Sequence, residues 1–200
     1  MSAFTWPPES RPDSTNQSEP TDQIAAAVLV PLFLQGAREE PHLVLTRRRA
    51  DLRRHAGEIS FPGGRWDAED ADLSETALRE AEEEIGLERS RVSLLGELPP
   101  TSTLATKYVI HPFVGTIPAG LAWRLSPKEV DAVLELPLKA ISAGRTRTQM
   151  ERRGFTFETD AYVVEEHLIW GATARIIENL LVSLEEGRFD GLPSSADPRP

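Results

Sequence analysis

The segment Thr76–Gly86, TALREAEEEIG, constrains the fold of this chain more than any other. At about 100° per residue, its apolar residues fall on one side of a helix and predict a buried stripe made of Leu78, Ala81 and Ile85. Asp72 or Ser74 can cap the start of this helix, and Gly86 suits the left-handed residue that ends it. We therefore expect a helix near Leu73–Ile85 that packs on a core through one face.

Three glutamates of this segment recur at spacings of three and four and are predicted to share the roughly opposite face: Glu80, Glu83 and Glu84. Like charges at these spacings repel by about 0.2–0.5 kcal/mol per pair. The C-terminal end of a helix also disfavours anions. A bound cation removes both penalties, and oxygen ligands without Cys or His partners favour Mg²⁺ or Mn²⁺. The alternative is a solvated acidic face, and these residues alone leave both interpretations open.

Segments of β-type and helical pattern alternate along the rest of the chain. The expected strands are Ile24–Leu34, His42–Thr46, Val92–Leu98, Tyr108–Ile117, Val130–Leu136 and Phe155–Tyr162, with Gly36–Pro41 as a turn. A second amphipathic helix is expected at Thr173–Leu184. Many strands with few helices favour an α/β (α+β) fold in which helices cover the faces of a mixed sheet.

The ends of the chain differ in composition from its middle. Residues 1–22 are rich in Pro, Ser, Thr and acid and predict a disordered tail, and 191–200 predict a flexible one, so 23–190 form the expected single domain. The chain has no cysteine, which excludes disulfides, thiolate nucleophiles and cysteine–zinc sites. Its longest apolar run, Ile24–Leu34, is shorter than the ~20 residues of a membrane span, and no secretory signal is recognisable. We expect a cytoplasmic protein without a membrane partner.

Charge is unevenly distributed. The net charge of −10 argues against a nucleic-acid partner. Basic residues nevertheless form two clusters, Arg47, Arg48, Arg49, Arg53 and Arg54, and Arg145, Arg147, Arg152 and Arg153. Such clusters in an acidic protein can bind a small anionic ligand, and the alternative is ordinary solvated surface.

A pair of glycines, Gly63–Gly64, follows the short run Ile59–Pro62 and predicts a strand that ends in a turn before the acidic helix. Read together, residues 64–87 resemble the Nudix box, in which a glycine and a glutamate precede Arg-Glu-apolar-x-Glu-Glu-x-Gly-apolar. The second half matches over residues 79–87, REAEEEIGL. The first half departs from the pattern, because the acidic position falls on Asp70 and eight residues separate it from Arg79; Glu69 is the other candidate.

The flanking segments are similar to those of coenzyme A pyrophosphatases, a branch of the Nudix hydrolases. This resemblance rests on residues 45–64, on Glu129–Val130 before Pro137–Leu138, and on residues 169–175, and it extends over about residues 24–185. It implies a Nudix-like α/β/α sandwich with a loop–helix–loop catalytic motif. The implied reaction is metal-dependent cleavage of coenzyme A, and of its thioesters, to 3′,5′-ADP and 4′-phosphopantetheine or its acyl form.

The resemblance also implies roles for individual residues. The expected metal ligands are Glu80, Glu84 and Glu83, and the expected catalytic residues are Glu83, Glu80 and Arg79, with Arg79 orienting a carboxylate. Residues expected to bind substrate are Arg47, Arg53, Arg54, Gly63, Gly64 and Lys107, where the arginines would meet the 3′-phosphate. A homodimer is possible.

Three alternatives remain open at this point. The substrate could be another nucleoside diphosphate derivative, such as ADP-ribose, NADH or a dNTP. The chain could be a Nudix-fold module that binds a nucleotide without turning it over. The acidic helix could instead be a surface for protein interaction.

Overall fold

The computed structural model describes residues 23–37, 39–51, 57–103, 107–152 and 154–189. Its strands are β1 (Ile24–Gln35), β2 (Glu40–Arg48), β3 (Ile59–Ser60), β4 (Gly63–Arg65), β5 (Ser93–Glu97), β6 (Thr101–Ser102), β7 (Tyr108–Thr116), β8 (Val130–Pro137), β9 (Arg145–Arg152), β10 (Phe155–Val164) and β11 (His167–Trp170). Its helices are α1 (Leu73–Ile85), α2 (Leu138–Ala143) and α3 (Gly171–Glu185), and η1 (Arg89–Arg91) is a 3₁₀ turn.

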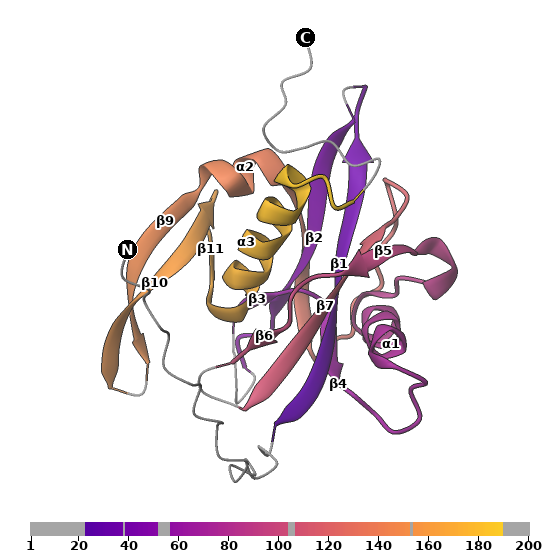
Figure 1. Cartoon of the computed structure of the whole chain (residues 1–200), viewed down its shortest axis with the longest axis horizontal. Coiled ribbons are helices and arrows are strands. Elements are labelled where there is room, and N and C mark those ends of the chain that lie inside the picture. The colour runs from indigo at the N-terminus through magenta and orange to yellow at the C-terminus, as the bar shows by residue number, and fades with distance from the viewer. Residues whose placement is uncertain (1–22, 38, 52–56, 104–106, 153, 190–200) are drawn as a thin grey trace, which may run out of the picture.

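An eight-stranded mixed sheet forms the centre of the molecule (Figure 1). Its main path runs β3-β2-β1-β7-β5, and β4, β6 and β8 pair with β1, β7 and β2 respectively. The β1–β7 pair is parallel, whereas the other pairs of this sheet are antiparallel. β1 therefore lies in the middle of the sheet, paired with β2, β4 and β7. A strand in this position is buried on both faces, which explains its long apolar sequence.

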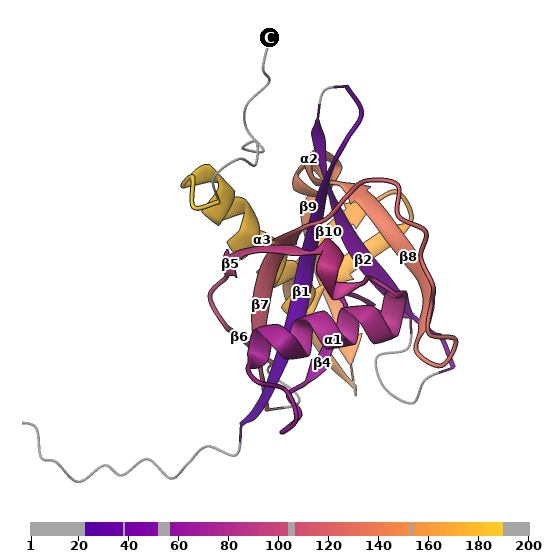
Figure 2. The ribbon, with the colours of Figure 1, turned by 90° about the vertical axis from the view of Figure 1, so that its right-hand side faces the viewer.

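Alternate residues of β1 face two separate cores. Ala27, Leu29 and Phe33 pack with the apolar stripe of α1. Val30 and Leu32 face the other side, where they join the core formed by α2, α3 and the smaller sheet. Figure 2 shows α1 lying across one face of the sheet, with α3 on the other side of β1. The predicted mixed sheet with helices on its faces is confirmed.

A second sheet, in the order β11-β10-β9, covers the α3 side of the molecule. β6, β9, β11 and α2 were not predicted from the sequence. β9 carries mostly Arg and Thr without an apolar alternation, and it is held by backbone pairing with β10 from Arg145 opposite Tyr162 to Arg152 opposite Phe155. The arginines of 145–152 thus belong to the outer strand of this sheet, and the side-chain pattern of the segment does not indicate a strand.

The other predicted elements agree with the structure to within a few residues, with one correction. Gly63 and Gly64 do not form a turn but lie in β4, opposite Val28 and Ala27 of β1. The predicted tails, as well as Arg53 and Arg54, lie outside the described residues. Among the described residues, every helix is too short or too polar to cross a membrane.

Candidate active site and metal centre

The position of α1 is set by its two ends. Asp72 caps the first turn, its carboxylate accepting a hydrogen bond from the backbone N–H of Glu75 at 3.0 Å. Gly86 ends the helix with a φ of 69°, and its N–H donates to the carbonyl of Glu82. Both caps were expected from the sequence. Between them, the buried stripe of α1 fixes which side chains turn towards β4 and which turn towards solvent.

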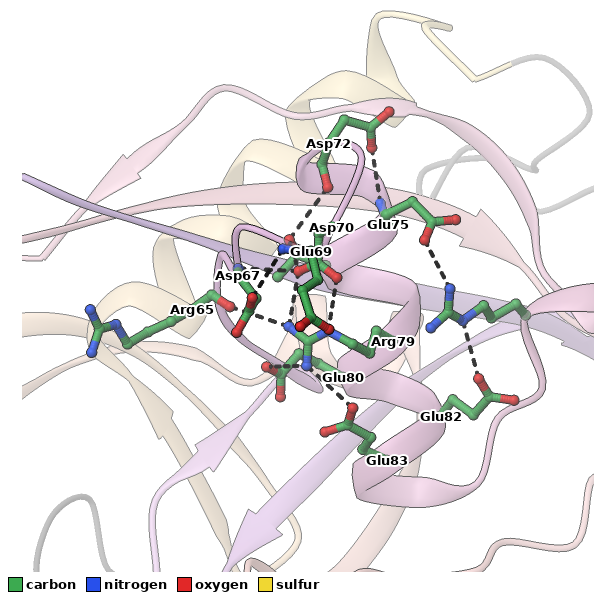
Figure 3. A network of polar contacts seen from close by, with 12 residues as sticks. Arg65, Asp67, Glu69, Asp70, Asp72, Glu75, Arg79, Glu80, Glu82 and Glu83 are labelled. Atoms are coloured by element: carbon green, nitrogen blue, oxygen red, sulfur yellow. Dashed lines mark hydrogen bonds and ion pairs between the residues drawn. The ribbon is translucent and has the colours of Figure 1, made fainter.

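Arg79 binds Asp70 with two parallel hydrogen bonds (Figure 3). Its Nε donates to Oδ1 at 2.9 Å and its Nη2 to Oδ2 at 3.0 Å, while Thr76 donates to the same carboxylate at 2.8 Å. Asp70 is 8% exposed. The guanidinium of Arg79 holds the pKa of Asp70 well below its usual range, so the pair is ionised at neutral pH. Glu69 is exposed, which makes Asp70 the acid of this loop that fixes the arginine.

The same arginine reaches two of the helix glutamates. Nη1 of Arg79 lies 3.0 Å from Oε1 of Glu80 and 3.3 Å from Oε1 of Glu83. Burial raises the pKa of Glu80, and Arg79 opposes that shift. The expected contact of Arg79 with carboxylates is therefore present, and it extends to three acids rather than one.

Glu84 departs from the expected arrangement, because its side chain is buried instead of sharing a solvent-facing surface with Glu83. It is 3% exposed, whereas the side chain of Glu83 is 61% exposed. Oε2 of Glu84 accepts a hydrogen bond from the N–H of Gly63 at 3.3 Å, and Oε1 lies 3.6 Å from Nη1 of Arg48. Burial raises the pKa of Glu84 to about 8, and Arg48 opposes that shift. The sequence pattern missed this burial because Glu84 borders the apolar stripe and β4 covers that edge of the helix.

The two glycines of β4 leave room for the helix carboxylates. A Cβ on Gly64 would lie 2.3 Å from Oε1 of Glu80. A Cβ on Gly63 would lie 2.3 Å from the carbonyl oxygen of Ala27 in β1. Gly64 therefore makes space for the carboxylate of Glu80, while Gly63 allows β4 to pack closely on the sheet and to present its N–H to Glu84.

The donor chemistry of α1 suits a hard divalent cation, because Glu80, Glu83 and Glu84 offer only carboxylate oxygens. Arg79 and Arg48 supply the positive charge that these carboxylates face in the structure. Among the described residues, the one group of three whose ligand atoms lie within 4.8 Å of one another is elsewhere, at Glu165, Glu166 and His167 in the β10–β11 turn. A metal on α1 thus requires its side chains to turn towards one another, which the exposure of Glu83 permits.

The other predicted substrate residues that the structure describes are Arg47 and Lys107. Arg47 binds Asp131 on the surface, at 2.8 Å between Nη2 and Oδ2. Lys107 is exposed, and its carbonyl accepts a hydrogen bond from the N–H of Ile24 at the start of β1.

Two charged residues close to the helix carboxylates were not predicted as site residues, although Arg48 belongs to the basic cluster seen in the sequence. Arg48 faces Glu84, and the negative charge of Glu129 raises the pKa values of both Glu84 and Glu80. Strand alternation was an available signal for Arg48. Every second residue of a strand faces the same side, so Arg48 lies on the side of Val44 and Thr46, and Val44 packs on the α1 side. Glu129 lies in a turn, and a turn has no side-chain periodicity from which its direction could be predicted.

Comparison with known proteins identifies the family to which the chain belongs. The NUDIX domain model matches residues 23–157. The uncharacterized Nudix hydrolase NudL of Salmonella paratyphi B is 40% identical over 176 residues, which cover 87% of this chain and 88% of that protein. The NudL protein of Salmonella typhimurium matches with the same identity and coverage.

Solved structures agree at the level of the fold. A MutT/nudix family protein from Enterococcus faecalis has a TM-score of 0.55 at 13% identity, covering 91% of this chain and 66% of that one. The M. smegmatis Nudix hydrolase RenU has a TM-score of 0.51 at 14% identity, covering 60% of this chain and 74% of that one. A family model that spans most of the chain, together with a 40% identical relative of matching length, shows that the chain belongs to the Nudix hydrolases, which act on pyrophosphate bonds.

Proposed function

We propose that the chain hydrolyses the pyrophosphate bond of coenzyme A, and of its thioesters, to 3′,5′-ADP and 4′-phosphopantetheine or the acyl form. Nudix hydrolases generally need divalent metal ions, usually Mg²⁺ or Mn²⁺. The observation that carries the metal proposal is the buried carboxylate of Glu84, one turn after Glu80 and beside the glycines of β4. Burying an ionisable group away from water is costly, and a bound cation offsets that cost.

The proposed chemistry divides between the ion and the protein. A divalent ion held by Glu80, Glu84 and Glu83 supplies charge neutralisation at the phosphoryl centre and a bound water of lowered pKa. Arg79, fixed by Asp70, orients Glu80 and Glu83. The exposed Glu83 is the proposed third ligand or general base. Arg79 acts through these carboxylates rather than on the substrate.

The coenzyme A proposal rests on the resemblance of residues 45–64 and on the basic residues near that segment. A 3′-phosphate requires positive charge beyond that needed for the diphosphate. The proposed 3′-phosphate contacts are Arg47, Arg53 and Arg54, with Lys107 as a weaker candidate; Arg47 would exchange its partner Asp131 for the phosphate. Gly63 and Gly64 are proposed to let the backbone of β4 approach the substrate closely. A homodimer and a cytoplasmic location remain predictions.

A substrate panel tests this function directly. The full chain is incubated with Mg²⁺ or Mn²⁺ and, separately, with coenzyme A, acetyl-coenzyme A, ADP-ribose, NADH and dNTPs, and kcat/KM is measured for each compound. We expect coenzyme A or its thioester to be preferred, with no cleavage in EDTA. A preference for ADP-ribose, NADH or dNTPs would reject the substrate while keeping the reaction class. Binding without cleavage of any compound would favour a non-catalytic nucleotide-binding module.

A further inference from the structure

Three consecutive arginines at the end of β2 have different acidic partners. Arg47 binds Asp131, and Arg49 binds Asp51 at 2.7–2.8 Å as well as the carbonyl of Pro127. Arg48 is directed instead at Glu84, within the proposed metal centre. Only the middle arginine of the three therefore has its charge at the site.

The backbone explains this placement. A bulge falls between Arg47, which lies opposite Ala132, and Arg48, which lies opposite Val130, so that Asp131 is passed over in the register. The N–H of Arg48 donates to the carbonyl of Glu58 at 3.0 Å, and its carbonyl accepts from Gly57 at 3.2 Å. The extra residue, Asp131, lies in β8, so β2 keeps its alternation and Arg48 faces the α1 side, as Val44 does.

A backbone segment beside the end of α1 connects Glu84 with Arg48. The N–H of Ser126 donates to the backbone carbonyl of Glu84 at 2.8 Å, and the N–H of Val130 donates to the carbonyl of Ser126 at 3.0 Å. Val130 in turn pairs with Arg48. One short segment, 126–130, thus connects the backbone of the buried acid with the backbone of the arginine that faces it.

The contact between the two side chains is loose. The distance of 3.6 Å between Nη1 of Arg48 and Oε1 of Glu84 exceeds hydrogen-bond length, whereas Arg79 holds Asp70 at 2.9 and 3.0 Å. The side chain of Arg48 is 27% exposed and that of Glu84 is 4% exposed. A cation that touches a buried anion without a directed hydrogen bond is held mainly by charge, and another cation can replace it.

We propose that Arg48 is an exchangeable counter-charge: a divalent ion bound at Glu84 displaces the guanidinium, which then binds an oxygen of the substrate's diphosphate. This inference rests on the proposed metal-dependent function. It adds a residue, Arg48, that links binding of the metal ion with binding of the substrate's diphosphate. Guanidinium groups suit this second role, because their planar donors match phosphate oxygens. The exchange also couples the two binding events, since each ligand then raises the affinity of the other by the same factor.

The test uses binding rather than turnover. Titration calorimetry of the full chain with α,β-methylene-ADP, a diphosphate that cannot be cleaved at this bond, is performed with saturating Mn²⁺ and in EDTA. For the unmodified chain we expect Mn²⁺ to tighten binding of this probe about tenfold or more. Arg48→Gln should lose about tenfold in affinity for the probe with Mn²⁺ present, and Arg48→Lys should fall between. Arg91→Gln, which removes an exposed arginine paired with Glu88, is the matched charge control.

Two outcomes would overturn the inference. One is an Arg48→Gln variant that binds the probe within about twofold of the unmodified chain while the control also does. The other is an equal loss in Arg91→Gln, which would attribute the effect to net charge. Thermal unfolding verifies that each variant is folded. If the unmodified chain cleaves no compound of the substrate panel but Arg48→Gln still weakens probe binding, the proposed function fails and the role of Arg48 stands.

Discussion

Replacing Glu84 by Gln is predicted to stabilise the protein while it abolishes activity. Glu84 has an ordinary pKa of 4.5 and a pKa of about 8 in the folded protein. Its carboxyl is neutral in both the folded and the unfolded state below pH 4.5, and the unfolded state loses its proton first as pH rises. Ionisation of Glu84 therefore lowers the free energy of unfolding between pH 4.5 and 8, by an upper bound of about 5 kcal/mol. Glutamine removes this cost and keeps an oxygen for the N–H of Gly63.

Urea unfolding in EDTA measures this effect. At pH 5 the variant and the unmodified chain should differ little, and at pH 9 the variant should be more stable by about 2–5 kcal/mol. Added Mg²⁺ or Mn²⁺ should stabilise the unmodified chain far more than the variant, because ion binding to the folded state shifts the equilibrium. A variant that is less stable than the unmodified chain at both pH values would refute the reasoning, since Glu84 would then be a structural residue.

Three further predictions follow from the site. Gly64→Ala should reduce kcat/KM at least about 100-fold with little loss of stability, because the added Cβ meets only the end of a glutamate side chain. Gly63→Ala should instead lower the unfolding free energy by about 3 kcal/mol, because its Cβ clashes with the β1 backbone. Activity assays and urea unfolding compare the two variants, and equal losses of stability would contradict this prediction. Asp70→Asn should destabilise by about 3 kcal/mol at pH 7, and by less below pH 3.8, where the unfolded state takes up a proton that the folded carboxylate does not; Glu69→Gln should change little, and similar losses in the two variants would disprove the assignment. Mn²⁺ affinity should rise with pH up to about 8, as Glu84 loses its proton, and calorimetry that finds no pH dependence would count against Glu84 as a ligand.

Much of the fold follows from apolar periodicity in the sequence. β1 and α3 carry strong patterns, and both lie where a buried strand and an amphipathic helix are expected. β9 was missed because its Arg and Thr side chains show no buried face, and α2 was missed because six residues are too few for a helical period. Such elements are fixed by pairing and packing with distant segments, which a local pattern does not contain.

The site was predictable where the motif is local and not where it depends on tertiary contacts. The caps of α1 follow from residues at its two ends, and the contact of Arg79 with carboxylates was implied by the resemblance of residues 79–87 to the Nudix box. The burial of Glu84 depends on β4, and the approach of Arg48 depends on how β2 and α1 are arranged in the fold. The choice between Glu69 and Asp70 likewise needed the path of the loop, which turns Asp70 inward to Arg79.

The most direct test of the account compares two glutamates of the same helix. Glu80 faces Gly64 and is proposed to bind the metal, whereas Glu82 is exposed and pairs with Arg89. Hydrolysis of coenzyme A in Mg²⁺ or Mn²⁺ is followed by mass spectrometry of 3′,5′-ADP for the unmodified chain, Glu80→Gln and Glu82→Gln. The account predicts a loss of about 1000-fold or more in kcat/KM for Glu80→Gln and a change within about threefold for Glu82→Gln. Equal activity of the two variants would contradict it.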